Sequence, residues 1–255
     1  KIMNIILTIA KNTFKETIRD KILYGILCFA LLFLISTTMF GSIYLGEDVK
    51  VIKDFGFAGI YIFSLIIAIF LGTSLIYKEL EKRTLYVIFS KPVSEFQFIL
   101  GKFFGLWFSV ILNILFMTAI YIAIVLIKGG GFDYASLFAI LLLIFELSIF
   151  ISLTIVFSTI TTPLAGTIYT IIVLYIGHSI GLIKGFIEKA SPFVKYLLLI
   201  VYYVFPNLEK FNLRNSVVYG SLPNSAQIIY PIIYSVLFTT ILLSLAIQAL
   251  KKQDL

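Results

Sequence analysis

The residues of this sequence that could do chemistry are few and widely separated. Its 255 residues include one histidine, one cysteine and three methionines, which is too few for a closed soft-ligand metal site within one copy. Gly101-Lys102 lacks the upstream glycine and the following hydroxyl residue that a phosphate-binding loop requires. The sequence therefore predicts no metal and no nucleotide bound by this chain, and no ATP hydrolysis of its own.

Two ionisable residues, Glu146 and His178, lie within long apolar stretches. A carboxylate inside a bilayer costs on the order of a few kcal/mol, so Glu146 should face other helices. It could contact substrate or carry protons; we favour a structural role in which it forms hydrogen bonds with Ser148 or Thr154, because a single carboxylate makes a poor relay. For His178 we favour a helix-packing role near the outer surface over ligand binding.

Glycines recur at a spacing that suits close helix packing. Gly177, Gly181 and Gly185 are four residues apart, which places them on one face of a helix so that another helix can approach closely. Gly101 and Gly105 have the same spacing. We expect this second pair to allow close packing at the base of its helix.

The most charged internal segment runs from Lys78 to Lys102 and separates two apolar runs. Charges of both signs favour oriented docking, and the apolar residues 85–89 are more than a cytoplasmic loop should leave exposed. Alternatively, these apolar residues lie at the membrane interface, where Tyr and Phe are common. The candidate docking residues are Lys78, Glu79, Glu81, Lys82, Arg83, Thr84, Leu85 and Tyr86.

The elements that position these residues follow from composition. The chain is 60% hydrophobic and 13% charged, with a mean hydropathy of +1.07, whereas soluble domains are roughly 45–50% apolar and 25% charged. The apolar runs are continuous, which predicts a single all-α integral membrane protein rather than a barrel. The net charge of +7 comes from basic residues beside apolar runs, as expected for lipid headgroups, so nucleic acid is not an expected partner.

Six transmembrane helices are expected, over residues 22–44, 60–77, 96–127, 135–160, 164–183 and 228–250. Pro92 followed by Ser94 and Gln97 predicts a capped start for the third helix, residues 128–131 predict a glycine turn, and Pro163 predicts the start of the fifth helix. Residues 1–20 alternate apolar and charged positions at helical spacing, which predicts an amphipathic interfacial helix. The alternative for residues 1–20 is a frayed terminus.

The distribution of charge predicts the topology. Basic residues in the amino-terminal segment place it in the cytoplasm, so both termini and the segment 78–95 are expected there. Residues 184–227 are then outside, despite their basic excess. Within them, residues 193–205 form only about 20 Å of helix, short of the roughly 30 Å hydrocarbon core. We favour a re-entrant piece covered by protein over a seventh crossing.

Several stretches carry a resemblance to a known family. They are NTFKETIRDKILYG (residues 12–25), GEDVKVIKDFG (46–56), IFLGTSLIYKELEKRTLYVIFSKPVSEFQFILGKFFG (69–105) and FPNLEKFNLRNSVVYG (205–220), together with the terminal KKQDL. In this order they resemble the permease subunits of type-two ATP-binding cassette transporters. The branch that includes nitrous oxide reductase maturation permeases is the most similar.

The resemblance implies one transmembrane permease domain over residues 1–255, in the plasma (inner) membrane. It implies a second permease copy, giving a homodimer, and two separate ATPase subunits that bind ATP and Mg. The segment 78–95 would supply the coupling helix that docks on the ATPase, residues 1–20 the connecting helix, and residues 184–227 the external, partly re-entrant region.

These observations predict the permease subunit of an exporter with an unknown substrate, which is not itself an enzyme. The alternative is a membrane scaffold that transmits ATPase motion to an extracytoplasmic partner without transporting anything. An intramembrane enzyme has the least support, since neither Glu146 nor His178 has an evident partner in the sequence.

Overall fold

The computed structural model describes residues 2–43, 48–90, 92–131, 134–187, 191–213 and 222–253, which form helices and turns without a strand. Within these ranges six helices are long and apolar enough to cross a membrane, which confirms the predicted fold class. They are α2 (Lys21–Ile43), α3 (Asp48–Leu75), α6 (Glu95–Ile127), α7 (Tyr134–Ile160), α8 (Pro163–Ile187) and α11 (Ser225–Lys251).

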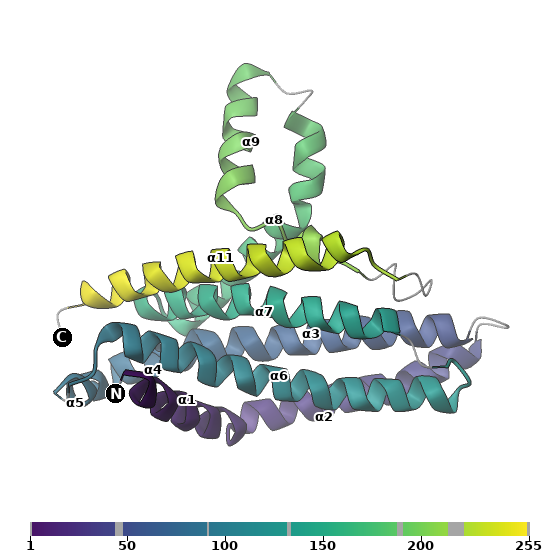
Figure 1. Ribbon diagram of the computed structural model, residues 1–255, viewed down its shortest axis with the longest axis horizontal. Helices are drawn as coiled ribbons and strands as arrows, with labels where there is room; N and C mark the ends of the chain where they lie inside the picture. The colour runs from purple at the N-terminus through teal and green to yellow at the C-terminus, as the bar shows by residue number, and fades with distance from the viewer. Residues whose placement is uncertain are drawn as a thin grey trace.

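Helix α7 is the centre of the bundle. It packs against α3, α6, α8 and α11, and Figure 1 shows α7 and α3 between α11 on one side and α6 and α2 on the other. Its sequence is apolar almost all round, as expected of a helix surrounded by others, and Leu142, Phe150 and Ile155 are completely buried. A polar side chain on α7 therefore has to find its partners within protein.

The predicted helix boundaries are confirmed at three places. Helix α6 begins with a capping box in which the Gln97 amide donates to Ser94 Oγ at 3.3 Å and the Ser94 amide donates to Gln97 Oε1 at 3.0 Å. The turn after α6 has Gly129 at φ 76° and Gly131 at φ 65°, a left-handed region that favours glycine. Helix α8 begins at Pro163.

The second span begins earlier than predicted. We expected this span to begin at Ile60, after an outer loop containing GEDVKVIKDFG (residues 46–56), but α3 is already helical from Asp48, where an acidic residue favours a helix start. Ile52 and Phe57 are buried, and a Cβ at Gly56 would lie 2.6 Å from the Tyr121 ring. Packing against α6 therefore extends α3 into a stretch whose charges suggested a loop.

The amino-terminal segment forms α1 (Ile2–Ile18), as predicted, and no fraying is seen over this range. It crosses the base of α6, where Gly101 is approached by Ile9, and Gly105 by Ala10 and Thr13. The predicted close packing at these two glycines is confirmed. Ile2, Met3 and Leu7 remain exposed, as an interfacial helix requires.

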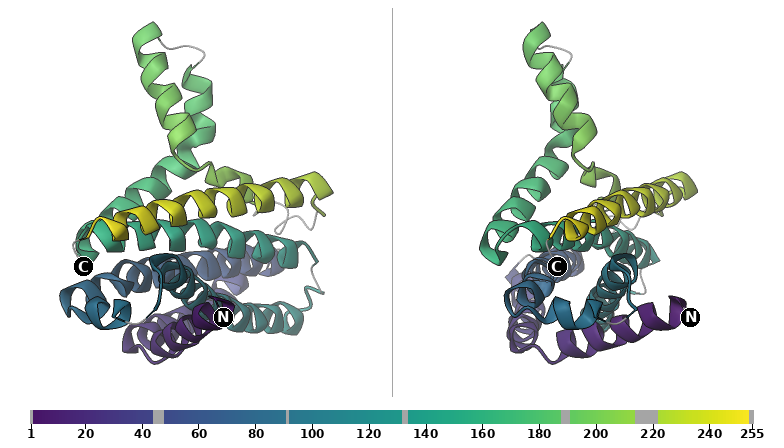
Figure 2. Two further views of the ribbon diagram at one scale, coloured as in Figure 1. Left: turned by 60° about the vertical axis from the view of Figure 1, so that its left-hand side comes forward. Right: turned by 90° about the vertical axis from the view of Figure 1, so that its left-hand side faces the viewer.

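A helical hairpin stands away from the bundle. It consists of the end of α8 and α9 (Pro192–Val204), and Figures 1 and 2 show it projecting to one side in all three views. At 13 residues, α9 is about 20 Å long, too short to span the membrane. None of its residues is buried, so the protein cover expected for a re-entrant piece is not provided by the described part of this chain.

After α9 the chain returns to the bundle through the short helix η1 (Leu208–Phe211). Both chain ends lie at one end of the bundle (Figure 1), which agrees with an even number of crossings and not with a seventh. Residues 188–190 and 214–221 of the predicted external region lie outside the described residues.

Candidate functional sites

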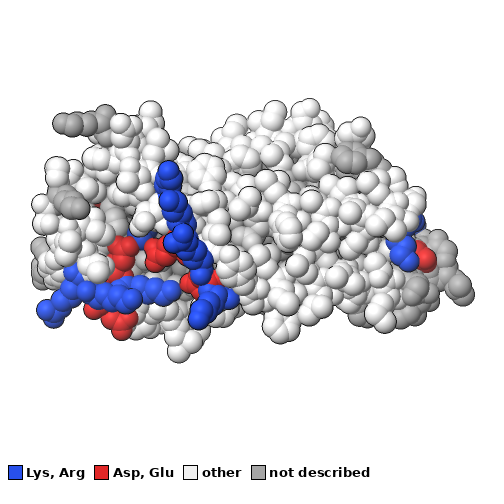
Figure 3. Space-filling view, turned by 90° about the horizontal axis from the view of Figure 1, so that it is seen from below, with Lys and Arg blue, Asp and Glu red and all other residues white. Residues whose placement is uncertain are grey.

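The predicted coupling segment forms two short helices, α4 (Tyr77–Glu81) and α5 (Thr84–Phe89), at the end of the bundle where the termini lie (Figure 1). Arg83 joins them with a φ of 55°, a left-handed conformation that turns the chain sharply. Charged side chains gather at this end of the molecule (Figure 3). The predicted docking residues that are exposed are Lys78, Glu81, Lys82, Arg83, Thr84 and Tyr86.

The other two predicted docking residues point into the protein. Leu85 is completely buried in the core, and Glu79 forms an ion pair with Lys102, which is 3% exposed. Glu16 of α1 also contacts Lys102, at 3.8 Å. Leu85 and Glu79 therefore anchor the segment and are not available to a partner, because packing and a buried lysine on α6 hold them inward.

Ser158 on α7 fixes the joint between α3 and α4. Its hydroxyl accepts hydrogen bonds from the backbone amides of Ile76 at 2.9 Å and Tyr77 at 3.0 Å. These amides lie where the helix changes direction, and the serine supplies the acceptor that they would otherwise lack. Displacement of α4 is therefore coupled directly to the central helix α7.

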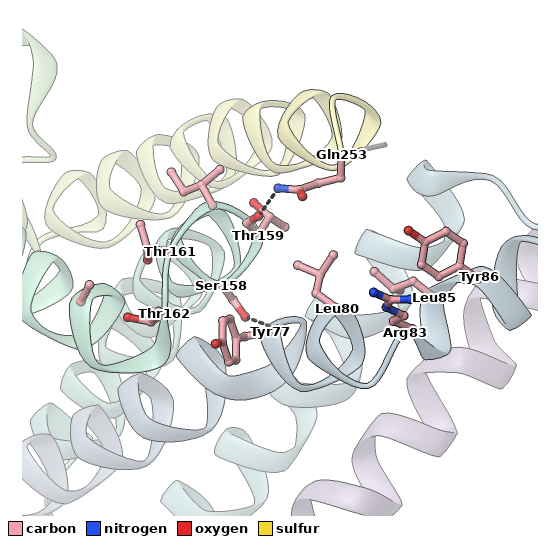
Figure 4. A pocket seen from close by; sticks show the side chains of 12 residues that line it. Tyr77, Leu80, Arg83, Leu85, Tyr86, Ser158, Thr159, Thr161, Thr162 and Gln253 are labelled. Carbon is pink, nitrogen blue, oxygen red and sulfur yellow. Dashed lines mark hydrogen bonds between the residues drawn. The ribbon is translucent and has the colours of Figure 1, made fainter. Parts of the chain in front are cut away.

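A groove of about 610 Å³ lies between this segment and the turn that joins α7 to α8. Figure 4 shows Arg83, Leu85 and Tyr86 on one side of it and Thr159 and Thr161 on the other. At its rim Gln253 Nε2 donates to the Thr159 carbonyl at 2.9 Å. The sequence analysis missed Ser158, which belongs to no motif, and gave no individual role to Gln253, which lies in the terminal KKQDL.

A second cluster lies at mid-length in the bundle and joins three helices. Tyr61 of α3 donates a hydrogen bond to Glu146 Oε1 of α7 at 3.0 Å. His178 Nε2 of α8 lies 3.2 Å from the same oxygen and 2.7 Å from the Tyr61 hydroxyl. Glu146 and His178, which the sequence analysis treated as residues without partners, therefore contact each other.

The hydrogen bonds predicted for Glu146 are wrong. Ser148 instead donates to the Phe145 carbonyl at 2.7 Å and lies 3.1 Å from Thr239 of α11. Thr154 donates to the Ile151 carbonyl of its own helix at 2.8 Å. Hydroxyls at these positions satisfy their hydrogen-bonding need within or beside α7 and leave Glu146 to α3 and α8.

Only one glycine of the predicted face in α8 has a close neighbour in the described structure. A Cβ at Gly177 would lie 2.5 Å from Leu208 Cδ1 and 2.8 Å from the Pro206 carbonyl oxygen. Gly181 and Gly185 have open space at the corresponding position. Gly177 thus admits the returning chain at η1, and among the described residues no long helix closely approaches Gly181 or Gly185.

A comparison with protein families gives a match over nearly the whole chain. A model of the ABC-2 family transporter proteins matches residues 7–255. A comparison with curated proteins gives no significant match.

Proposed function

Since the chain belongs to the ABC-2 transporter family, a family of membrane transport components that associate with an ABC ATPase, we propose that it is the membrane-spanning subunit of an exporter. In this proposal two copies form a homodimer in the plasma (inner) membrane, and two ATPase subunits carry out the ATP hydrolysis. Both termini and the segment 78–95 face the cytoplasm. We also propose that it belongs to the branch of this family that includes the nitrous oxide reductase maturation permeases, which its sequence resembles.

The observation that supports it most is that the segment of α4, Arg83 and α5 carries exposed charges and borders a groove. The same segment is attached to the long helices by Glu79 and Leu85. Glu81, Lys82 and Arg83 are exposed, and Arg83 and Tyr86 line the groove of about 610 Å³. Opposite charges at a surface orient a docking partner. Such a surface suits an ATPase that must bind in one orientation.

The attachments supply a route for motion. Glu79 connects α4 to α6 through Lys102, and Ser158 connects the α3–α4 joint to α7. When the ATPase subunits close on ATP, displacement of α4 would be passed to the central helices, whose repacking is the kind of rigid-element shift used in switching proteins.

The alternative, a scaffold that transmits motion to an extracytoplasmic protein, draws on the α8–α9 hairpin. Phe193, Tyr196 and Tyr203 are each more than 70% exposed on it. A protein bound there would respond to movement of α8. Transport assays on the purified complex separate the two functions, because only an exporter would move a solute.

The proposal is tested with the double variant Glu81→Lys with Arg83→Glu, expressed with its ATPase. Like charges placed against a complementary surface cost several kcal/mol, so we expect at least roughly a tenfold loss of ATPase co-isolation and of ATPase stimulation. Lys128→Glu is the matched control, since Lys128 is exposed on the turn after α6. Undiminished co-isolation and stimulation in the double variant would overturn the docking assignment.

A further inference from the structure

The cluster of Tyr61, Glu146 and His178 opens into a cavity of about 340 Å³. This volume falls within the roughly 300–1,000 Å³ of small-molecule sites. Apart from the cluster and Asn212, its walls are apolar and are formed by Phe57, Ala58, Ile62, Ala139, Leu143 and Phe211. An apolar chamber with a few converging polar groups is the usual form of a ligand site.

The second carboxylate oxygen of Glu146, Oε2, is available to a ligand. Its side chain is 5% exposed, and the contacts with Tyr61 and His178 both use Oε1. Over the residues that the structure describes, Oε2 accepts no hydrogen bond. Because Glu146 lines the cavity, this oxygen can accept a hydrogen bond from a ligand there, and a positively charged N–H group would form the stronger, charge-assisted kind.

The surroundings favour a cation over an anion. Glu209 Oε2 lies 3.9 Å from His178 Nδ1, so two carboxylates flank one imidazole. The cluster therefore holds two acidic side chains against one imidazole, a composition that suits a cation better than an anion. Lys210 does not offset these acidic side chains at the cavity, since its ammonium lies over the Tyr234 ring, 4.2 Å from the centroid.

The apolar walls indicate what else the ligand carries. Phe57, Tyr61 and Phe211 contribute three aromatic rings to the lining, and aromatic faces attract cations and cover apolar groups. A bare metal ion suits the site poorly, because no group of three or more His, Cys, Asp or Glu side chains that could hold one occurs among the described residues.

We propose that this cavity binds a small organic cation, with its ammonium group at Glu146 Oε2 and its apolar part against Phe57 and Phe211. Binding is a property of this chain alone. The role of such a cation as exported cargo rests on the proposed function.

The test measures saturable binding of tritiated phenethylammonium to the purified protein in lipid nanodiscs at pH 7. A hydrogen bond to a charged group contributes about 1.5–3 kcal/mol, so Glu146→Gln should weaken binding at least roughly tenfold. Lys128→Gln, on the exposed turn after α6, should leave binding unchanged. Neutral 2-phenylethanol and anionic 3-phenylpropanoate should compete at least roughly tenfold less well than unlabelled phenethylammonium.

A second variant keeps the test decisive if Glu146→Gln does not fold. Ala58→Phe would fill the cavity and leave the polar cluster intact, and it should abolish binding. The proposal is overturned by absent saturable binding, by equal competition from 2-phenylethanol, or by full binding in a folded Glu146→Gln or Ala58→Phe protein. ATPase co-isolation, measured on the same samples, reports separately on the proposed function.

Discussion

At the scale of single residues, Lys102 shows how a buried charge on the apolar helix α6 anchors the surface helix α4. Its side chain is 3% exposed and its ammonium pairs with Glu79 and Glu16, so α1, α4 and α6 meet at one buried cation. Removing one partner of a buried ion pair is much more destabilising than the pair is stabilising, because the remaining charge is left without compensation.

We therefore predict that Lys102→Met lowers the free energy of unfolding by about 3 kcal/mol, measured by denaturant titration in detergent micelles. Lys78→Met is the matched control. Lys78 is about half exposed and pairs with Asp20 at 3.7 Å, and such surface pairs contribute at most about 1 kcal/mol. Equal losses in the two variants would show that the buried pair does not anchor α4.

The sequence alone identified Glu146 and His178 as unusual, because ionisable groups are rare in apolar helices. It did not identify Tyr61, one of 15 tyrosines, because tyrosine is common in membrane helices and nothing local sets this one apart. Depth gave no signal either, because the predicted span begins at residue 60, whereas in the structure Tyr61 and Glu146 both fall near the middle of their helices. The pairing itself depends on which helices are neighbours, and this a hydropathy pattern does not contain.

At the scale of elements, the helix boundaries of α6 and α8 could be predicted because local chemistry fixes them, through a capping box and a proline. The start of α3 could not. Residues 48–59 carry charges typical of a loop, but Tyr121 and Val125 of α6 lie along that side of the bundle and α6 packs on α3. Tertiary packing there outweighs local composition.

The glycines of α8 also show that sequence spacing alone does not reveal which residues other elements contact, and they lead to a prediction. Gly177→Ala should lower the free energy of unfolding by about 1–3 kcal/mol, since overpacking forces a shift and one of the atoms met is the backbone oxygen of Pro206. Gly181→Ala meets open space and should be neutral or stabilising by up to about 1 kcal/mol, because alanine favours helix.

Thermal unfolding of both variants in detergent, followed by the loss of monodisperse protein, gives the comparison. A Gly181→Ala protein as unstable as Gly177→Ala would contradict the open space beside Gly181. It would also indicate that the whole glycine face is covered, as the spacing first suggested.

At the scale of the whole molecule, composition predicted an all-helical membrane protein with six spans, since continuous apolar runs of this length have few alternatives. It did not predict that the end of α8 and α9 would stand away from the bundle (Figure 2). Helix α9 contacts α8, but none of its residues is buried, and this exposure is not evident from its apolar sequence.

Charged side chains gather at the end of the bundle that carries both termini (Figure 3). This distribution distinguishes the two ends of the molecule. We propose that this end of the bundle faces the ATPase and that α4 and α5 contact it. Tyr86 on α5 and Tyr134 at the start of α7 are matched probes of that claim, since they are 49% and 63% exposed and α7 begins at the opposite end of the bundle from α5 (Figure 1).

The most direct test places the photo-crosslinker p-benzoylphenylalanine at residue 86 or at residue 134 in cells that express the intact complex. The account predicts that illumination joins the residue 86 variant to a protein whose mass spectrum contains a phosphate-binding loop of an ABC ATPase. The residue 134 variant should give no such adduct. An ATPase adduct from residue 134, with none from residue 86, would contradict the account.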